Sequence, residues 1–183
     1  MVILIIIAIV VVLGLWLISA KNRIMREEQN VFTELNNAKL VVDRRFKNIE
    51  STVNMMKAHN SEIAKAYERV VQMRSGVAAD STDAEAYANF EQGLQSVAKG
   101  INIQVEQYPE LGQFFSVDKF QTTMAQHDRD VELAKKLYNH EVEQFNTIIQ
   151  TIPYNLVAGG KTLHKYWEVT DSEVKDEYIP SFE

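Results

Sequence analysis

The sequence predicts an all-α protein in which an N-terminal transmembrane helix continues into a long antiparallel helical bundle. The first observation is an uncharged apolar stretch at the N-terminus. The second is that apolar residues then recur at alternating steps of three and four through three long segments, which is helical periodicity. The third is that 183 residues contain only seven Gly and three Pro, which permits long uninterrupted elements. No stretch shows the period-two alternation of a half-buried strand, so no sheet is expected.

The first twenty residues, "MVILIIIAIVVVLGLWLISA", form the predicted membrane anchor. As a helix, residues 2–18 rise about 26 Å, close to the roughly 30 Å of a bilayer core. A cleaved signal peptide is the alternative, but it would carry a basic residue before the apolar run and small residues three and one before the cut. Here Ile18 interrupts that pattern ahead of Ala20. The side chains expected to face lipid are Val2, Ile5, Ile9, Leu13 and Trp16.

The charge next to the span predicts its orientation. Lys21, Arg23 and Arg26 follow the apolar stretch, and no Lys or Arg precedes it. Positively charged flanks stay on the cytoplasmic side of a membrane. The sequence therefore predicts a single-pass protein of the cell membrane with its helical domain in the cytoplasm and a short N-terminus outside.

The bundle, residues 21–157, is expected to contain one long helix at about 21–75, a second at about 83–107 and a third at about 116–152. Gly76 ends the first, Ser81 or Thr82 can cap the second, and Pro109 and Gly112 make a tight connector before the third. Residues 158–183 are expected to form a short helix and an acidic tail. The apolar face of the first helix, with Asn60 as its polar break, comprises Leu35, Ala38, Val42, Phe46, Ile49, Val53, Met56, Ile63, Tyr67 and Val70. Those of the second and third comprise Tyr87, Phe90, Leu94, Val97, Ile101 and Val105, and Phe120, Met124, His127, Val131, Ala134, Tyr138, Val142, Phe145 and Ile149.

Composition and motifs exclude several classes of function. A net charge of −6 without a basic stripe argues against nucleic acid as a partner. The absence of Cys excludes disulfides and thiolate chemistry. The stretch "NLVAGGKT", 155–162, has Asn155 where a phosphate-binding loop needs Gly, and a helix rather than a strand precedes it. No Glu-x-x-His, zinc-ligand or nucleophile-elbow spacing occurs, so no catalytic residue, cofactor or metal is predicted.

Residues 100–157 resemble the LemA family. The matching positions are Tyr108-Pro109-x-Leu111, Phe120-Gln121, Ala134-Lys135, Tyr138-Asn139, Phe145-Asn146 and Ile152-Pro153, with an earlier arginine pair at Arg44-Arg45. The resemblance implies a membrane-anchored, all-helical domain of bacterial type. It implies no established biochemical activity and supplies no catalytic residues.

Two repeated aromatic–Asn pairs are the main candidates for a specific structural role. Tyr138 and Phe145 lie on the apolar face one heptad apart, and Asn139 and Asn146 follow about 100° further round the helix. Each amide is expected to hydrogen-bond a neighbouring helix and fix its register.

The charged residues on the polar faces allow more than one interpretation. Arg44 and Arg45 are expected to be solvent-exposed, to pair with an acidic helix, or to contact a partner. The charges of 127–136 are expected to form a solvated helix surface.

The favoured hypothesis is a non-enzymatic scaffold that self-associates or recruits a protein partner at the bacterial membrane. It depends on apolar residues outside the predicted seam of the first helix, which suggest a second contact surface. They are Val31, Phe32, Leu40, Val41, Met55 and Val71. The alternative is a ligand-sensing bundle with a pocket near His127, Tyr138 and Asn139. A single His on an apolar seam is more often a hydrogen-bonded core residue or a pH-sensitive packing contact than a ligand.

Overall fold

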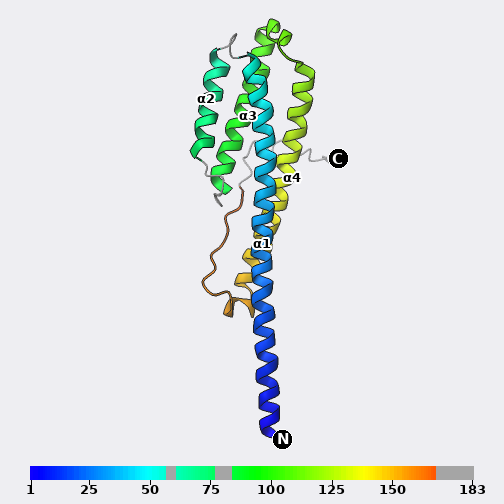
Figure 1. Ribbon diagram of the computed structural model, residues 1–183, viewed down its shortest axis with the longest axis vertical. Coiled ribbons are helices and arrows are strands. Elements are labelled where there is room, and N and C mark those ends of the chain that lie inside the picture. The colour runs from blue at the N-terminus through cyan, green and yellow to red at the C-terminus, as the bar shows by residue number, and fades with distance from the viewer. Residues whose placement is uncertain (57–60, 77–83, 168–183) are drawn as a thin grey trace, which may run out of the picture.

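The computed structural model describes residues 1–56, 61–76 and 84–167, and its long elements are four helices that run alternately up and down (Figure 1). They are α1 (Val2–Met56), α2 (Ser61–Gly76), α3 (Ala84–Gln107) and α4 (Val117–Gln150), with the short 3-10 helices η1 (Pro109–Gln113) and η2 (Tyr154–Leu156). No strand occurs in these three ranges. The predicted all-α bundle is therefore confirmed.

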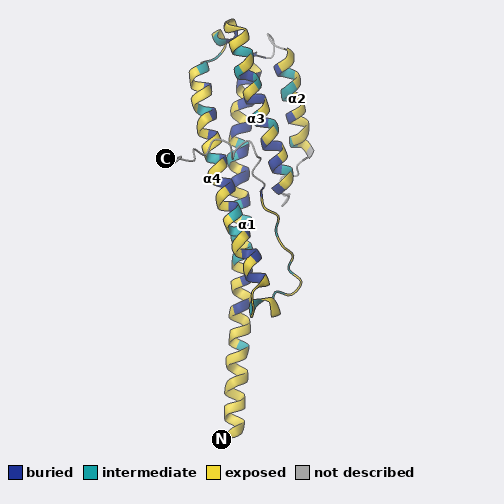
Figure 2. Cartoon of the chain, turned by 180° about the vertical axis from the view of Figure 1, so that it is seen from behind, coloured by how far each residue is buried: buried dark blue, intermediate teal, exposed yellow. Residues whose placement is uncertain are grey.

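The N-terminal part of α1 extends beyond the bundle with nothing packed against it (Figure 2). Val2 is 70% exposed and Ile9 is 53% exposed, and no other part of the described chain covers them. Within the described ranges, α1 is the one helix long and apolar enough to cross a membrane. It continues without a break into the bundle, where Ala20 and Ile24 are its first buried side chains.

The core consists of the apolar faces that the sequence periodicity predicts. Every predicted seam residue of α4 is buried, and so is every one of α1 through Met56. In α3 the seam is buried as far as Ile101, and Val105 is half-buried against the same core. Phe46 connects the helices at the centre, because its ring contacts both Tyr67 of α2 and Phe90 of α3.

The predicted single helix over 21–75 is wrong: α1 ends at Met56, and α2 packs back beside it. Hydrogen bonding of Tyr67 to Glu50 and pairing of Arg74 with Asp43 show that α1 and α2 are antiparallel. The physical reason lies in α4, which begins at Val117 near the level of Met56. A straight continuation would leave its apolar face without a covering helix, whereas the reversal buries Ile63 and Val70.

The connectors agree with the sequence where the structure describes them. Ser116 caps α4 by accepting a hydrogen bond from the backbone N–H of Lys119. The predicted tight connector is η1, in which Leu111 is buried. The expected polar break at Asn60 and the expected caps Ser81 and Thr82 lie outside the described residues.

The predicted short helix does not form over residues 158–167, the part of the C-terminal region that the structure describes. After η2, Gly159 and Gly160 adopt positive φ angles of 58° and 80°, which glycine tolerates and other residues rarely adopt. The following segment, 161–167, is extended and runs back along the bundle (Figure 1). We call residues 161–167 the C-terminal segment. The acidic tail from residue 168 onward lies outside the described residues.

Candidate functional site

The two asparagines of the repeated motif hold the C-terminal segment by its backbone. Asn146 donates from Nδ2 to the carbonyl oxygen of His164 (2.9 Å) and accepts at Oδ1 from the N–H of His164 (2.9 Å). Asn139 does the same to Trp167, with distances of 2.9 and 2.8 Å. Each amide thus satisfies both backbone groups of one residue, as a neighbouring strand would. We call Asn139 and Asn146 the asparagine clamp.

The two asparagines can bind two residues of the segment because their separation along α4 matches the length of three residues of extended chain. Seven residues of α-helix separate Asn139 from Asn146, a rise of about 10.5 Å. Three residues of extended chain separate His164 from Trp167, a distance of about 9–10 Å at 3.1–3.4 Å per residue. The segment is antiparallel to α4, since the later residue of the segment meets the earlier asparagine. The heptad spacing of the motif is therefore suited to an extended peptide.

Aromatic side chains fill the space beneath the clamped backbone. The ring of His164 lies edge-on to Phe145 of α4 and Phe32 of α1, with centroids 4.9 and 5.5 Å apart. Trp167 is 1% exposed and contacts the ring of Tyr138 at 6.3 Å. The Tyr138 hydroxyl donates to the carbonyl oxygen of Lys165 at 3.0 Å. Both aromatic residues of the motif therefore help to bind the segment as well as to form the core.

Two ion pairs flank the clamped residues. The ammonium of Lys161 contacts the carboxylate of Glu28 on α1. Lys165 contacts Glu85 at the start of α3, at 2.9 Å between largely exposed side chains. An exposed pair contributes little free energy, so the second contact mainly favours one position of the segment.

A second polar cluster, which we call the ion network, comprises Arg45, Glu91 and Lys135, which are buried, and Asp128, which lies at its exposed edge. Arg45 on α1 is 1% exposed; its Nη1 lies 2.8 Å from Oε1 of Glu91 on α3, and its Nη2 lies 2.7 Å from Oδ1 of Asp128 on α4. Lys135 on α4 approaches the other oxygen of Glu91 at 3.6 Å. The three buried charges are thus each paired with an opposite charge, and Asp128 supplies the second carboxylate from the exposed edge.

The arginine pair therefore divides into two roles. Arg45 is the member that pairs with acidic residues of neighbouring helices, whereas Arg44 is exposed. The predicted solvated surface over 127–136 is wrong for Lys135, which is buried, whereas Asp128 is exposed as predicted and also pairs with Arg45.

The sequence did contain a signal for this network. Glu91 and Lys135 each follow a seam residue, Tyr87 and Val131, by four positions, which is the spacing of buried positions in a helix.

His127 on the seam of α4 is a packed core residue that contacts Asn48 of α1 through Nε2. Burial lowers its pKa, the Arg45 guanidinium lowers it further, and the carboxylates of Asp130 and Asp128 oppose the shift. A neutral imidazole fits this position, because it can hydrogen-bond an amide without adding a charge to the core.

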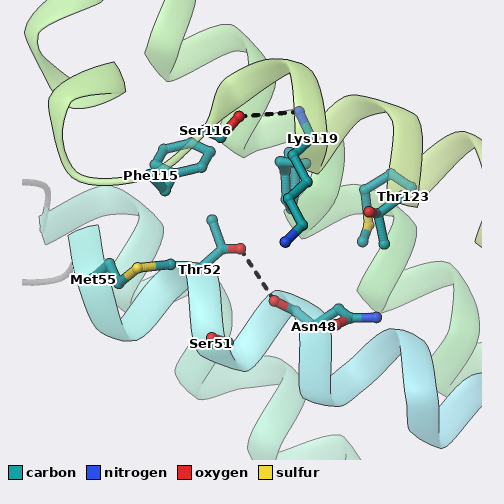
Figure 3. Close-up of a pocket in the computed structure, with 10 residues that line it drawn as sticks. Asn48, Ser51, Thr52, Met55, Phe115, Ser116, Lys119 and Thr123 are labelled. Carbon is teal, nitrogen blue, oxygen red and sulfur yellow. Dashed lines mark hydrogen bonds between the residues drawn. The ribbon is translucent and has the colours of Figure 1, made fainter.

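The predicted pocket near His127 and Tyr138 is not where the main described hollow lies. Tyr138 is buried beneath the C-terminal segment. A hollow of about 360 Å³ lies further along, between the end of α1 and the start of α4 (Figure 3). Its lining combines apolar and polar groups, namely Asn48, Ser51, Thr52, Met55, Phe115, Ser116, Lys119, Phe120, Thr123 and Met124. In the described ranges, no group of His, Asp and Glu side chains is arranged to hold a metal ion.

The exposed apolar part of α1, the clamp and the ion network together define a class of protein: a helical bundle with a candidate membrane span that folds an extended C-terminal segment onto its own long helices. The family model of the LemA family matches residues 34–179, which includes the arginine pair, both aromatic–Asn pairs and the clamped segment. The chain therefore belongs to the LemA family. No curated protein matches it in sequence.

The clamp generates the first prediction. Replacing Asn139 and Asn146 by Ala removes four hydrogen bonds, so local release of the segment should become easier by about 1–3 kcal/mol per residue. Trypsin should cut faster after Lys161 while circular dichroism stays unchanged. The matched control is Asn37→Ala, since Asn37 is exposed and bonds only the nearby Glu34. Equal cleavage of all three proteins would contradict the clamp.

The ion network generates the second prediction. Arg45→Met leaves the buried Glu91 with a single cation and should destabilise the bundle by about 3–5 kcal/mol. Arg44→Met removes the same side chain from an exposed position and should change stability by less than about 0.5 kcal/mol. Urea unfolding in mild detergent measures both values. Similar losses in the two variants would show that the network is not the stabilising element.

The half-buried ring of His164 generates the third prediction. Burial lowers its pKa, Lys161 lowers it further, and Glu28 opposes the shift. The unfolded state therefore binds the proton more tightly, and the contribution of neutral His164 is complete above about pH 6.5. It is lost as pH falls from there through the folded pKa.

The thermal unfolding midpoint between pH 8 and pH 5 tests this dependence. His164→Phe keeps a ring between the two phenylalanines and should flatten the curve. His140→Phe, at an exposed position, should leave it as steep as in the parent. His127 titrates in all of these proteins and gives a common background. An unchanged slope in His164→Phe would contradict the assignment.

Proposed function

We propose that this LemA-family protein is a non-enzymatic, single-pass scaffold of the bacterial membrane whose bundle self-associates or recruits a protein partner. The observation that carries the proposal is the continuity of α1 from the apolar span into the core. From residue 19 to residue 56 the helix rises about 55 Å without a break. Such a helix holds the bundle at a fixed height above the bilayer, which is the geometry a scaffold needs.

Exposed apolar side chains on the bundle support a contact surface. Three of the six predicted off-seam residues are used internally, because Val31 is in the core, Val41 packs against the core and Phe32 contacts His164. Leu40, Met55 and Val71 remain 57%, 42% and 39% exposed. Exposed apolar residues outside the span favour association with another protein surface.

The pairing of the buried charges supports a structural rather than a catalytic role. Glu91 lies between Arg45 and Lys135, and Arg45 also contacts Asp128. Groups that are satisfied by one another in this way stabilise a particular helix arrangement. A general base or a nucleophile would instead need access to a substrate.

The proposal places the bundle in the cytoplasm, because Lys21, Arg23 and Arg26 directly follow the span. The fourth prediction follows from that orientation. Because the chain has no Cys, a single introduced cysteine is the only thiol that can be labelled. A single cysteine introduced at exposed Gln126 should react with a membrane-impermeant maleimide only after the cells are lysed. Labelling in intact cells would place the bundle outside.

Self-association gives the fifth prediction. Native mass spectrometry of the full chain in mild detergent should show species above the monomer. The combined variant Leu40→Lys, Met55→Lys and Val71→Lys should shift the distribution toward monomer, because charges on an apolar contact surface oppose its burial.

A matched variant controls for the added charge. Asn36→Lys, Gln126→Lys and Gln150→Lys introduce the same three charges at exposed polar positions and should leave the distribution unchanged. A strict monomer that also captures no partner on pull-down would overturn the scaffold proposal.

Ligand sensing is the second candidate, and the hollow between α1 and α4 favours it. Its wall includes Asn48, which also contacts His127, so a bound molecule would touch the core hydrogen bond directly. Apolar walls with a few polar groups suit a small organic ligand. Met124→Trp should fill the hollow and abolish any thermal shift that a ligand library produces. A shift that survives this substitution would place the ligand elsewhere.

A further inference from the structure

The asparagine clamp recognises features that any extended peptide chain provides. Its four hydrogen bonds go to the backbone N–H and carbonyl groups of His164 and Trp167. Recognition of an extended segment through its main chain, with side-chain pockets for selectivity, is a general mode of peptide binding. Nothing in this geometry requires the segment to belong to the same chain as α4.

The side chains beneath the clamp define which peptide fits. Contact with the bundle recurs at every third residue, through Lys161 on Glu28, His164 between two phenylalanine rings, and Trp167 in the core. Leu163 and Tyr166 lie between these positions and are 57% and 48% exposed. The site therefore selects an extended peptide with the pattern Lys-x-x-His-x-x-Trp, which the C-terminal segment itself provides.

The joint between α4 and the segment combines exposed residues with partly buried ones. Ile152 and Leu156 are 76% and 77% exposed, and η2 is a single turn. Tyr154, Val157 and Ala158 are partly buried against the core, and the two glycines at positive φ follow. Redirecting this joint would therefore release the partly buried contacts of these three residues and none of the fully buried core residues.

The membrane places the segments and grooves of neighbouring copies at the same height. Glu28 lies ten residues beyond Ile18, the end of the apolar run, or about 15 Å above it along α1. Every copy anchored by the same helix presents Glu28, and the Lys161 that it binds, at that level. A segment needs only a lateral displacement to reach the groove of a neighbour, and confinement in the bilayer raises its effective concentration there.

We propose that the asparagine clamp is an exchangeable peptide-binding site, and that the C-terminal segment of a second copy of this chain occupies it when copies associate. This inference rests on the self-association proposed above and specifies how it takes place. Each copy then supplies a groove made by α1 and α4 and a segment that fills the groove of its neighbour. The buried contacts are the same in cis and in trans, so proximity decides between them.

Disulfide trapping in the full-length protein tests the exchange, since the chain has no native Cys. One copy carries Glu28→Cys, and a second, differently tagged copy carries Lys161→Cys. The two are reconstituted together into lipid vesicles and mildly oxidised. Exchange should give mixed disulfide dimers in several-fold excess over those formed when the second copy carries Lys136→Cys, an exposed lysine of α4 outside the segment. A single chain with both Glu28→Cys and Lys161→Cys shows the yield for the cis arrangement.

Two further variants keep the result specific. Adding Asn139→Ala and Asn146→Ala to the Glu28→Cys copy should reduce the mixed dimer several-fold. The pair Glu85→Cys and Lys165→Cys reports independently on the same arrangement, because these side chains also meet across the segment. If the cis protein cross-links while mixed dimers stay at the Lys136→Cys level for both pairs, the exchange is overturned.

Native mass spectrometry separates the two proposals. Oligomers without mixed dimers would overturn the exchange alone, and self-association would then use another surface. A strict monomer would overturn both. Mixed dimers that depend on the clamp would support both.

Discussion

The antiparallel pairing of α1 with α4 is the constraint on which the rest of the structure depends. Arg45 with Asp128 and Asn48 with His127 mark this pairing in the bundle, and Arg23 with Tyr154 of η2, which directly follows α4, continues it toward the apolar end of α1. The pairing determines where α1 stops, because α4 begins at the level at which α1 ends. It also creates the groove, since Phe32 and Phe145, one from each helix, contact the same face of the C-terminal segment.

Polar groups specify this helix arrangement at two places, between the helices and at the edge of the core. The ion network joins α1, α3 and α4 through one carboxylate, that of Glu91. The cost of desolvating these charges offsets much of their mutual attraction. The main effect of the network is therefore to disfavour other helix arrangements, in which the charges would be buried without partners. The asparagine clamp lies at the edge of the core, where neutral amides bind backbone without that penalty. One side of α4 thus contributes core side chains and also the two asparagines, whose spacing matches that of an extended chain.

The sequence predicted what depends on helical periodicity and little of what depends on tertiary pairing. The seam from Leu35 to Met56 follows from residue spacing, the start of the third helix near residue 116 follows from the onset of its periodicity, and both are observed. The reversal after Met56 did not follow, because helix propensity is continuous there and the limit is the length of α4. The heptad repeat of Asn139 and Asn146 predicted hydrogen bonds to a neighbouring helix, and this is wrong, because the partner is the extended C-terminal segment. The segment could not be predicted, since residues 161–167 have no strong local preference and take their conformation from the clamp.

Amide hydrogen exchange across the C-terminal segment tests the asparagine clamp most directly. The N–H groups of His164 and Trp167 are held by asparagine oxygens, whereas those of Leu163 and Tyr166 lie between the clamped positions. We expect the amides of His164 and Trp167 to exchange at least about tenfold more slowly than those of their two neighbours. We also expect Asn146→Ala to remove protection at His164 before it affects Trp167. Uniform exchange over all four amides, unchanged by Asn146→Ala, would contradict the asparagine clamp.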